Sequence, residues 1–293
     1  MVCRERISGL GLARIGLWSL EAVMKVLFYG GCHASALKDI FQRVARGNHE
    51  FSALTNYLII QEGKPFPYEI LPTIDAIVFS PIRNKGAWNT SHLEERCSEL
   101  NIPYISYPWL QWNGYFPGIR KIEGIPPHVW GLAPLMDALE RGASVDDLER
   151  EATLNPSLES QAKAFAADAT KQLRMHEEGV DIPISGFVET RHRDERLFYT
   201  PDHPAPPIYK HVVEQIAGRL GIQRRLFGKV RSPHTDRLPI LPVVAKALRL
   251  RFEATEFALE NQPKPIPLRD YLARLHLDFH RAKAEDSAGV DPR

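Results

Sequence analysis

A single cysteine–histidine pair lies at the junction between a predicted strand and a predicted helix. The run 25–30 (KVLFYG) is almost continuously apolar, as expected of a strand buried in a parallel sheet, and a helical pattern begins directly after Gly31. Cys32 and His33 therefore fall in the first turn of a helix, beside a glycine turn. The start of a helix favours a thiolate and accommodates an oxyanion or a phosphate. We interpret the turn as a candidate nucleophile site, with a purely structural connection as the alternative.

A polar loop follows the predicted strand at 75–80. The loop has the sequence SPIRNKG and contains Ser80, Arg83 and Lys85. In an open parallel sheet, ligands bind at the carboxyl ends of the strands, which is where this loop begins. The two cations are therefore candidates for phosphate contacts, and solvated loop charges are the alternative.

An aromatic loop follows the next predicted strand, at 103–108. It has the sequence YPWLQWNGYFPG and includes Trp109, Trp112 and Tyr115. Aromatic rings at the end of a strand suit stacking on an adenine ring or on the face of a sugar, and Trp and Tyr also carry polar groups. A lid or a packed loop is the structural alternative.

A histidine precedes a predicted helix in the second half of the chain. His203 stands between Asp202 and Pro204, just before the helix predicted at 206–221. The proline restricts His203 to an extended conformation and so fixes the direction of its ring. A histidine held in this way is suited to general-base catalysis, and capping of the following helix is the alternative.

Two other residues of chemically active types have structural interpretations. Cys97 lies on the apolar stripe of the helix predicted at 89–101 and is expected in the core. His176 lies near the end of a long helix, where it is expected to interact with the negative end of the helix dipole.

The pattern of elements predicts an α/β fold, with an N-terminal parallel Rossmann-like sheet flanked by helices and a predominantly helical C-terminal half. Asn89, Thr90 or Ser91 is predicted to cap the helix at 89–101, with Glu94 three residues after Ser91 as in a capping box, and Ser144 and Asp147 are in the same register for the helix at 144–154. Asn155 is predicted to cap the next helix, with Pro156 as its first residue. The Arg- and Pro-rich segment 222–245 is predicted to be loop. The predicted strands are 25–30, 51–59, 75–80 and 103–108; the predicted helices are 32–45, 89–101, 144–154, 156–178, 206–221 and 267–286.

The predicted domain organisation has four parts. Residues 1–23 are interpreted as an extension or a mis-assigned start, because Met24 directly precedes a strong strand. Residues 24–130 form the α/β sheet part, 131–286 a helical part sharing the same core, and 287–293 a tail.

Charge and composition exclude several classes of protein. The formal net charge of +1 provides no general field that would attract nucleic acid or an anionic membrane. The segment 7–23 contains Arg14 and Glu21 and lacks a cleavage site, so we expect neither a signal peptide nor a membrane span. Three cysteines without paired spacing predict neither a disulfide framework nor a zinc site. They fit a reducing compartment, and we expect a cytoplasmic protein without a metal.

Four motifs in order resemble one protein family. They are FYGGCHASAL, FSPIRN, YPWLQWNGYFPG and RLFYTPDHP, and together they extend over roughly 24–222. On these motifs the chain resembles the WcbI-type capsular polysaccharide biosynthesis acetyltransferases, which bind coenzyme A. One position differs, since Gly31 stands where the family commonly has Asn.

The resemblance implies a cytoplasmic O-acetyltransferase that transfers an acetyl group from acetyl-CoA to a sugar of a capsular or extracellular polysaccharide precursor. Partners would be acetyl-CoA as co-substrate, a sugar or glycan acceptor, and the enzymes of polysaccharide assembly. The acetyl group would pass either directly or through an acetyl-cysteine. The resemblance assigns catalysis to Cys32, His33 and His203. The residues predicted to bind the cofactor are Gly31, Ser80, Arg83, Lys85, Tyr115, Arg191 and Arg196, with Arg193 as a further phosphate contact.

Other functions remain open at this point. A glycan esterase or deacetylase would also place a nucleophile after the first strand, although usually as serine in a Gly-Asp-Ser turn, which the chain lacks. A non-catalytic protein that binds coenzyme A or a sugar is a second alternative. A glycosyltransferase is disfavoured because no Asp-x-Asp metal motif lies near a strand end.

Overall fold

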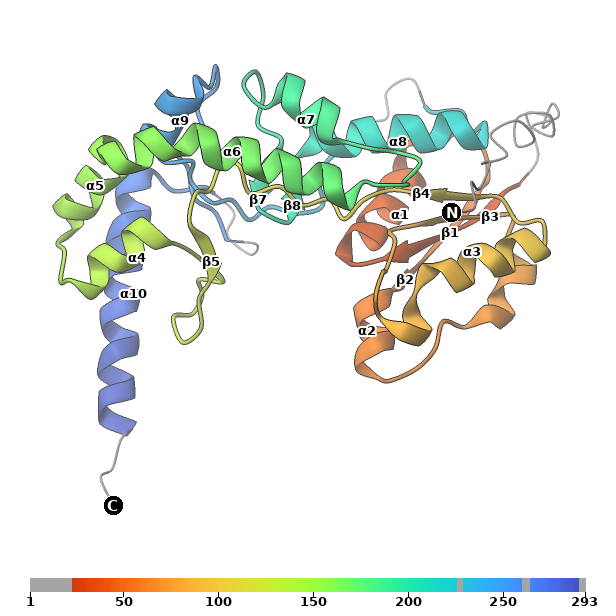
Figure 1. The fold of residues 1–293 in the computed structure, drawn as a ribbon, viewed down its shortest axis with the longest axis horizontal. Coiled ribbons are helices and arrows are strands. Elements are labelled where there is room, and N and C mark those ends of the chain that lie inside the picture. Colours follow the sequence, from red (N-terminus) through yellow and green to blue (C-terminus); the bar gives the residue numbers. More distant parts are fainter. Residues whose placement is uncertain (1–22, 226–228, 260–263, 290–293) are drawn as a thin grey trace, which may run out of the picture. The chain divides into compact units, whose positions relative to one another are not determined.

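The computed structural model describes residues 23–225, 229–259 and 264–289. The extension predicted at 1–23 lies outside the described residues except for Val23, and so does the predicted tail beyond Gly289. The chain forms two compact units, which are traced in Figure 1. The sheet unit comprises described residues among 23–109, 180–182 and 210–230. The helical unit comprises described residues among 110–179, 183–209 and 231–289.

The sheet unit is built on a four-stranded parallel sheet with the order β2-β1-β3-β4. Val26 of the central strand β1 pairs with Phe51 of β2 on one side and with Ala76 of β3 on the other. This arrangement confirms the predicted parallel α/β fold. The elements are β1 (Lys25–Gly30), α1 (Cys32–Val44), β2 (Glu50–Thr55), α2 (Asn56–Gln61), η1 (Tyr68–Thr73), β3 (Ala76–Phe79), η2 (Gly86–Trp88), α3 (Thr90–Glu99), β4 (Tyr104–Ser106) and most of α8 (Pro206–Leu220).

Both faces of the sheet are covered by side chains. Leu27, Tyr29, Ile77 and Phe79 face a buried cluster that includes Leu93 and Cys97 of α3, as predicted for the stripe of that helix. On the opposite face, the Phe28 ring packs 5.4 Å from the Phe41 ring of α1. A strand covered on both faces must be apolar throughout, which explains the continuous apolar runs in β1 and β3.

The strand predicted at 51–59 is wrong in its second half. β2 ends at Thr55, and the chain continues as the helix α2 from Asn56. Thr55 pairs with Gly30, the last residue of β1, so no neighbouring strand remains to pair with a longer β2. Without a hydrogen-bonded neighbour at this edge, the helix satisfies the backbone groups instead.

The capping box predicted for α3 is also wrong. The helix begins at Thr90, so Ser91 lies inside it. Asn89, another of the predicted caps, occupies the N-cap position, but its side chain does not cap the helix. Instead, Asn89 Oδ1 accepts a hydrogen bond from the Lys85 backbone N–H at 2.7 Å, and Thr90 Oγ1 accepts one from Ile82 N at 3.2 Å. These side chains therefore fasten the preceding polar loop to the start of α3.

Two short segments return to the sheet unit from later in the chain. The Ile182 backbone N–H donates to the Ser106 carbonyl at 3.0 Å, and the Arg225 N–H donates to the Val44 carbonyl at 2.8 Å. These bonds attach later segments to the sheet unit, so the division of the chain into two units is discontinuous. The predicted four-part organisation stays a prediction.

The helical unit contains long helices and two short antiparallel ladders. The capping box of Ser144 and Asp147 is present, and Asn155 Oδ1 accepts from Leu158 N at 2.9 Å, so both predicted helix starts are confirmed. α10 continues three residues into the segment predicted as a tail. The elements are β5 (Ile119–Lys121), β6 (Trp130–Leu132), α4 (Ala133–Glu140), α5 (Val145–Leu154), α6 (Pro156–His176), α7 (Ser185–Arg191), β7 (Phe198–Thr200), β8 (His203–Pro204), α9 (Pro242–Leu248) and α10 (Leu268–Gly289).

Besides α2, sequence reasoning missed three helices, α4, α7 and α9. They are eight residues or fewer in length, which is too short for a helical period to stand out. The start of α7 is capped by a residue outside the helix, because the buried Glu177 carboxylate accepts hydrogen bonds from the N–H groups of Ile184 and Ser185. The end of the segment 222–245, which is predicted to be loop, is helix in the structure, because α9 begins at Pro242.

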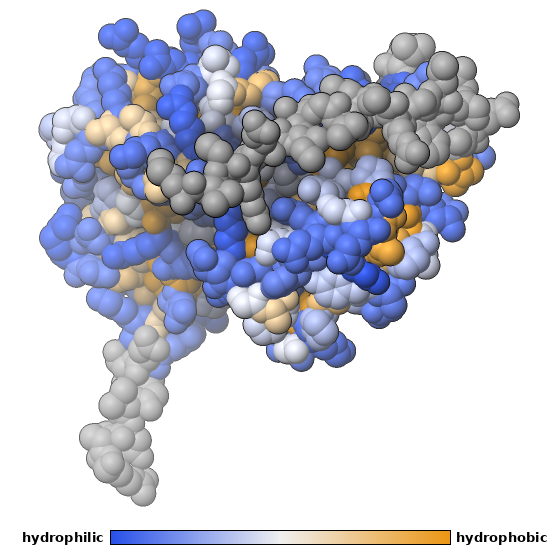
Figure 2. All heavy atoms as spheres, turned by 45° about the vertical axis from the view of Figure 1, so that its right-hand side comes forward, coloured by the Kyte–Doolittle hydropathy of each residue, from blue (hydrophilic) through white to orange (hydrophobic). Residues whose placement is uncertain are grey.

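The surface is mostly hydrophilic on the face shown in Figure 2. Among the described residues, none of the helices combines the length and the apolar character needed to cross a membrane. The most exposed large apolar side chains are distributed over several elements. They are Val23, Tyr57, Leu58, Val129, Leu154, Met175 and Leu277.

A buried histidine in the helical unit predicts a pH-dependent stability. His128 Nε2 lies 3.0 Å from Asp278 Oδ2, and burial lowers the pKa of His128 below its usual value. The unfolded chain then binds a proton more readily than the folded chain, so stability falls as the pH drops below about 6.5. We expect His128→Leu to lower the free energy of unfolding at neutral pH by about 1–3 kcal/mol and to flatten its decline on acidification.

Urea denaturation of both proteins between about pH 7.5 and pH 5.5 measures this effect. The control is His92→Gln, which replaces an exposed histidine of α3 and should leave the slope unchanged. An equal decline in wild type and His128→Leu would show that His128 does not carry the pH dependence.

Candidate functional site

The turn between β1 and α1 lies where the strand order of the sheet reverses. β2 lies on one side of β1 and β3 on the other, which creates a topological switch point at the carboxyl ends of β1 and β3. Ligands of open α/β sheets bind in this position. The structure places three predicted residues there, Gly31 and Cys32 after β1 and Ser80 after β3, and the Ser80 N–H donates to the Tyr29 carbonyl at 3.0 Å.

Close approach of aromatic side chains requires the two glycines of this turn. A Cβ on Gly30 would lie 3.0 Å from the Tyr107 hydroxyl oxygen, and a Cβ on Gly31 would lie 2.6 Å from the Trp109 indole. Gly31 has a φ of −74°, which any residue can adopt. The space that Trp109 occupies, and not the backbone conformation, therefore excludes a side chain at Gly31.

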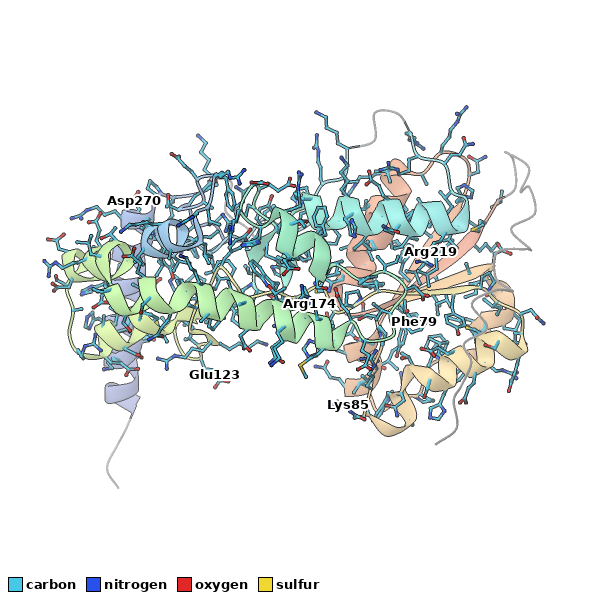
Figure 3. All side chains as sticks on the ribbon, turned by 45° about the horizontal axis from the view of Figure 1, so that its top comes forward. Phe79, Lys85, Glu123, Arg174, Arg219 and Asp270 are labelled. Carbon is cyan, nitrogen blue, oxygen red and sulfur yellow. The ribbon has the colours of Figure 1, made fainter. Side chains whose placement is uncertain are left out.

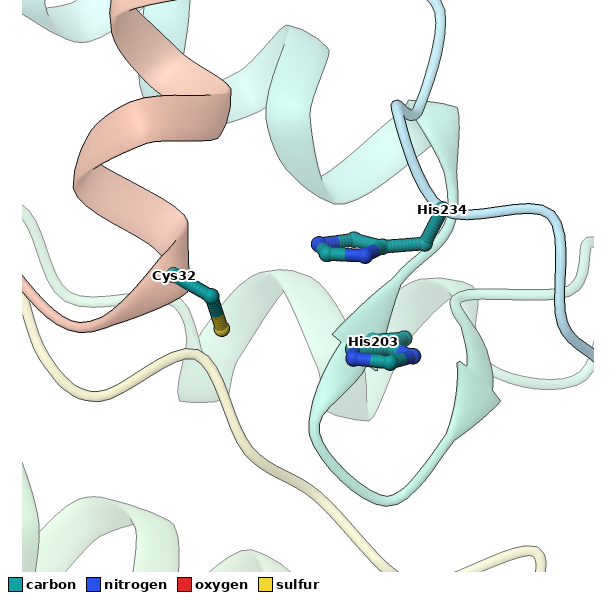
Figure 4. A group of neighbouring side chains, drawn as sticks. All are labelled: Cys32, His203 and His234. Atoms are coloured by element: carbon teal, nitrogen blue, oxygen red, sulfur yellow. The ribbon is translucent and has the colours of Figure 1, made fainter. Parts of the chain in front are cut away.

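Cys32 and His33 differ in their exposure. Cys32 is the first residue of α1 and is half-buried, and Figure 4 shows its side chain projecting from the first turn of the helix. His33 is only 1% exposed, and its ring meets the Trp109 indole edge-on with centroids 5.2 Å apart. The thiol is thus the more accessible of the two groups.

Tyr107 was not among the predicted site residues. It directly follows β4, it is fully buried, and among the described residues its hydroxyl has no hydrogen-bond partner. Burial raises the pKa of Tyr107, and the charge of Cys32 raises it further. The only sequence signal was its position at the carboxyl end of a strand, within the aromatic loop.

The polar loop after β3 exposes its two predicted phosphate-binding cations. Arg83 and Lys85 are both exposed, and two residues of the loop, Asn84 and Gly86, have positive φ values of 58° and 57°. Figure 3 labels Phe79, which ends β3, and Lys85 in the loop that follows. The structure therefore leaves these charges at the surface of the sheet unit, and their contact with phosphate stays a prediction.

The aromatic loop divides into an exposed and a buried part. Trp109 is 37% exposed, whereas Trp112 and Tyr115 are almost completely buried. Trp112 Nε1 donates to Thr170 Oγ1 at 3.1 Å, and the Tyr115 hydroxyl donates to the His192 carbonyl at 2.7 Å. Trp112 and Tyr115 are thus part of the core of the helical unit, and of the three rings only that of Trp109 is exposed to solvent.

The predicted arginines serve contacts within the helical unit. Arg191 pairs with Glu195 at 2.7 Å, and this carboxylate raises the pKa of Arg191. Arg196 donates to the backbone carbonyls of Phe198, Tyr199 and Leu238. Burial lowers the pKa of Arg196 to about 10, which still leaves it charged at neutral pH. A phosphate-binding role for either arginine stays a prediction.

His203 lies in the helical unit, in the short strand β8, as expected for a residue restricted by Pro204. Its Nδ1 atom is 2.8 Å from both carboxylate oxygens of Asp236. The carboxylate accepts the proton on Nδ1, so Nε2 is left as the basic nitrogen. This partner favours the general-base interpretation of His203 over the helix-capping alternative.

A second histidine supports this arrangement. The rings of His203 and His234 stack with an interplanar angle of 2° and centroids 3.9 Å apart, and Figure 4 shows them face to face. Ser232 Oγ donates to the Pro204 carbonyl at 2.9 Å and accepts from His234 N at 3.2 Å. These contacts hold the segment around His234 and Asp236 against β8.

Sequence reasoning missed His234 and Asp236, because both lie in the segment predicted as loop. The signal was the run SPHTD at 232–236, in which a histidine and an aspartate follow a proline outside any periodic pattern. Nothing in that run of the sequence indicated that the Asp236 carboxylate forms a hydrogen bond with His203, which is 33 residues away.

A separate pocket of about 610 Å³ lies in the helical unit and contains none of the predicted site residues. Its lining includes Asp137, Glu151 and Asp168 but only one cation, Arg141. This excess of carboxylates disfavours binding of the phosphates of coenzyme A.

Comparison with known proteins identifies one family and one similar structure. The sequence model described as "Polysaccharide biosynthesis enzyme WcbI" matches residues 25–225. A solved structure of WcbI is similar over 91% of this chain and 93% of that chain, with a TM-score of 0.68 and 19% sequence identity. That structure is described as the native protein without the disulfide bond between coenzyme A and a cysteine. No match was found among curated proteins.

Proposed function

Because the chain belongs to the WcbI family of polysaccharide biosynthesis enzymes, we propose that it transfers an acetyl group from acetyl-CoA to a hydroxyl group of a polysaccharide precursor. The observation that carries this proposal is the half-buried thiol of Cys32 at the switch point of the parallel sheet. The acceptor is a sugar or glycan of a capsular or extracellular polysaccharide, and the reaction takes place in the cytoplasm beside other assembly enzymes.

Coenzyme A is the ligand that the family membership favours. The description of the WcbI structure connects coenzyme A with a cysteine of that protein. In the present chain, Cys32 is the half-buried cysteine, whereas Cys97 is buried in the core. We therefore assign the thioester end of acetyl-CoA to the Cys32 turn, and its phosphates to the exposed cations Arg83 and Lys85.

The chemistry requires a nucleophile, a base and donors for an oxyanion. In the covalent route, Cys32 Sγ forms a bond to the acetyl carbon and the bond to the coenzyme A sulfur breaks, so that coenzyme A leaves as a thiolate. The acceptor hydroxyl then attacks the carbonyl carbon of the acetyl-cysteine while a base removes its proton. The bond from this carbon to Sγ breaks, and Cys32 is released as a thiolate. We assign the role of base to His203 Nε2, since Asp236 holds the proton on Nδ1.

Direct transfer is the other route. The acceptor hydroxyl then attacks acetyl-CoA itself, and the Cys32 thiol forms no bond to the acetyl group. A thiol at the start of α1 favours the covalent route, because this position stabilises a thiolate.

Binding of coenzyme A tests the proposal. We expect wild type to bind coenzyme A in isothermal titration calorimetry, and the double variant Arg83→Ala, Lys85→Ala to raise the Kd about tenfold, because charge-assisted contacts to the phosphates are lost. The matched control is Lys25→Ala, Arg96→Ala. Lys25 is the first residue of β1, and Arg96 lies in the last turn of α3. Both therefore lie towards the amino ends of the strands, away from the loop that contains Arg83 and Lys85.

An equal loss in both double variants would indicate a general charge effect. An unchanged Kd in both would remove Arg83 and Lys85 from the site. A wild-type protein that does not bind coenzyme A contradicts the proposed function.

A hydrolase is the second candidate, because the His203–Asp236 pair would activate water as readily as a sugar hydroxyl. The two activities differ in their product. Release of free acetate at the same rate with and without nucleotide-sugar acceptors would indicate hydrolysis, whereas an acetylated sugar detected by mass spectrometry indicates transfer.

A further inference from the structure

We propose that Tyr107 is a further catalytic residue, whose hydroxyl donates a hydrogen bond to the carbonyl oxygen of an acyl group that reacts at Cys32. The inference concerns a residue that neither the sequence motifs nor the family match assigns. It rests on the proposed role of Cys32 as nucleophile, and it does not depend on the identity of the acyl donor.

The position of the hydroxyl is the first support. Tyr107 follows β4, which is two strands away from β1 in the sheet. Its side chain reaches across the end of β3, because its hydroxyl oxygen lies 3.0 Å from the position that a Cβ of Gly30 would occupy. Ser80 of the β3 end borders the same position, with its Cβ at 3.4 Å. The hydroxyl thus points into the turn from which Cys32 projects.

The lack of a partner is the second support. The Tyr107 hydroxyl is completely buried and forms no hydrogen bond with any of the described residues. A buried hydroxyl without a partner destabilises a fold, and a phenylalanine would fill the same volume without this cost. A hydrogen bond to a bound acyl group would satisfy the hydroxyl, so the arrangement is one that a ligand completes.

The protonation state of the Tyr107 hydroxyl is that of a hydrogen-bond donor. Burial, and secondarily the charge of Cys32, raises the pKa of Tyr107 above its usual value. Tyr107 therefore keeps its proton at neutral pH and does not act as a base.

The assigned step is the attack on the acyl carbon. Cys32 Sγ forms a bond to that carbon, and the electron pair of the carbonyl double bond moves to the oxygen. The Tyr107 O–H donates a hydrogen bond to this oxyanion without losing its proton. The electron pair then re-forms the double bond, and the leaving group departs with the electrons of the bond that breaks.

Two reagents distinguish a hydrogen bond from Tyr107 to the oxyanion from a general effect of Tyr107 on the reactivity of the Cys32 thiol. Acetylation of Cys32 by p-nitrophenyl acetate passes through an oxyanion, whereas alkylation by iodoacetamide does not. We expect Tyr107→Phe to slow acetylation about 10- to 100-fold and to change alkylation less than twofold. Mass spectrometry of the peptide that contains Cys32 gives both rates, so reaction at other cysteines does not interfere.

Tyr271→Phe is the matched control. Tyr271 is likewise completely buried and its hydroxyl likewise has no partner among the described residues, but it packs against His128 and Phe257 in the helical unit. Neither rate should change in this variant. The melting temperature should fall in neither variant, because both hydroxyls are unpaired.

Slower acetylation with unchanged alkylation supports the inference. An equal loss of both rates would show that Tyr107 only positions or activates the thiol, and no loss of either would show that its hydroxyl is not a donor; both results overturn the inference. A wild-type protein that binds coenzyme A but is not acetylated at Cys32 also overturns it. Conversely, a protein with the expected rates that does not bind coenzyme A contradicts the proposed function and leaves this inference standing.

Discussion

Cys32→Ala is expected to remove all protein-bound acetyl label and to lower the release of coenzyme A from acetyl-CoA at least about 10³-fold. In the covalent route the acetyl group is carried by Sγ, and alanine has no atom that can replace it. Wild type is incubated with radiolabelled acetyl-CoA, quenched in acid and counted. Hydroxylamine should release the label, because it cleaves thioesters.

The control for this experiment is Cys97→Ala. Cys97 lies in the core against β3, and burial together with Glu94 raises the pKa of its thiol to about 11. It is therefore a poor nucleophile at neutral pH, and its replacement should leave the label unchanged. An unlabelled wild type, together with a Cys32→Ala variant that still acetylates a sugar at the normal rate, would establish direct transfer instead.

Asp236→Asn is expected to lower the rate of acetyl transfer about 10³-fold without weakening the binding of coenzyme A. The Asp236 carboxylate accepts the Nδ1 proton of His203, so the basic nitrogen of the neutral imidazole is Nε2, which we propose accepts a proton from a hydroxyl. An asparagine amide in the same place can donate to Nδ1 instead, and the proton of the neutral imidazole then resides on Nε2. The residue thus positions the base and its proton, and it does not itself touch the substrate.

A spectroscopic measurement distinguishes this role from a loss of structure. Nitrogen-15 NMR of the histidine rings should show the Nδ1–H tautomer of His203 in wild type and its loss in Asp236→Asn. Asp236→Glu should restore part of the activity, because the carboxylate is retained. The control is Asp202→Asn, a neighbouring carboxylate that accepts a hydrogen bond from Thr200 at 2.9 Å and should leave the tautomer unchanged. An altered rate with an unaltered tautomer would refute the positioning role.

The aromatic loop shows that residues alike in the sequence can differ in burial. Trp109, Trp112 and Tyr115 are within seven residues of one another, and all three are equally plausible ligand contacts in the sequence. The structure buries Trp112 and Tyr115 in the helical unit and exposes the Trp109 ring. Burial depends on which segments pack on the loop, and these come from distant positions such as Thr170 and His192.

Local patterns in the sequence determined the main elements of the fold. The strand, glycine turn and helix of 25–44, the helix starts at Ser144 and Asn155, and the parallel sheet all follow from residues close to one another along the chain. Apolar periodicity and capping act over a few residues, so a sequence displays them directly. For the same reason, the predicted secondary structure is wrong or incomplete where a neighbouring strand ends, as at Thr55, or where a carboxylate outside a helix caps it, as Glu177 caps α7.

Only the tertiary structure decided which groups serve the candidate chemistry within each unit. It brought Asp236 and His234 to His203 in the helical unit, and it brought the Tyr107 hydroxyl to the glycine turn before Cys32 in the sheet unit. Tyr107 and Gly30 are far apart along the chain and meet because β1, β3 and β4 end at one edge of a parallel sheet. The sequence therefore predicted the position of the thiol, whereas its surroundings depend on side chains that only the packing of distant segments brings together.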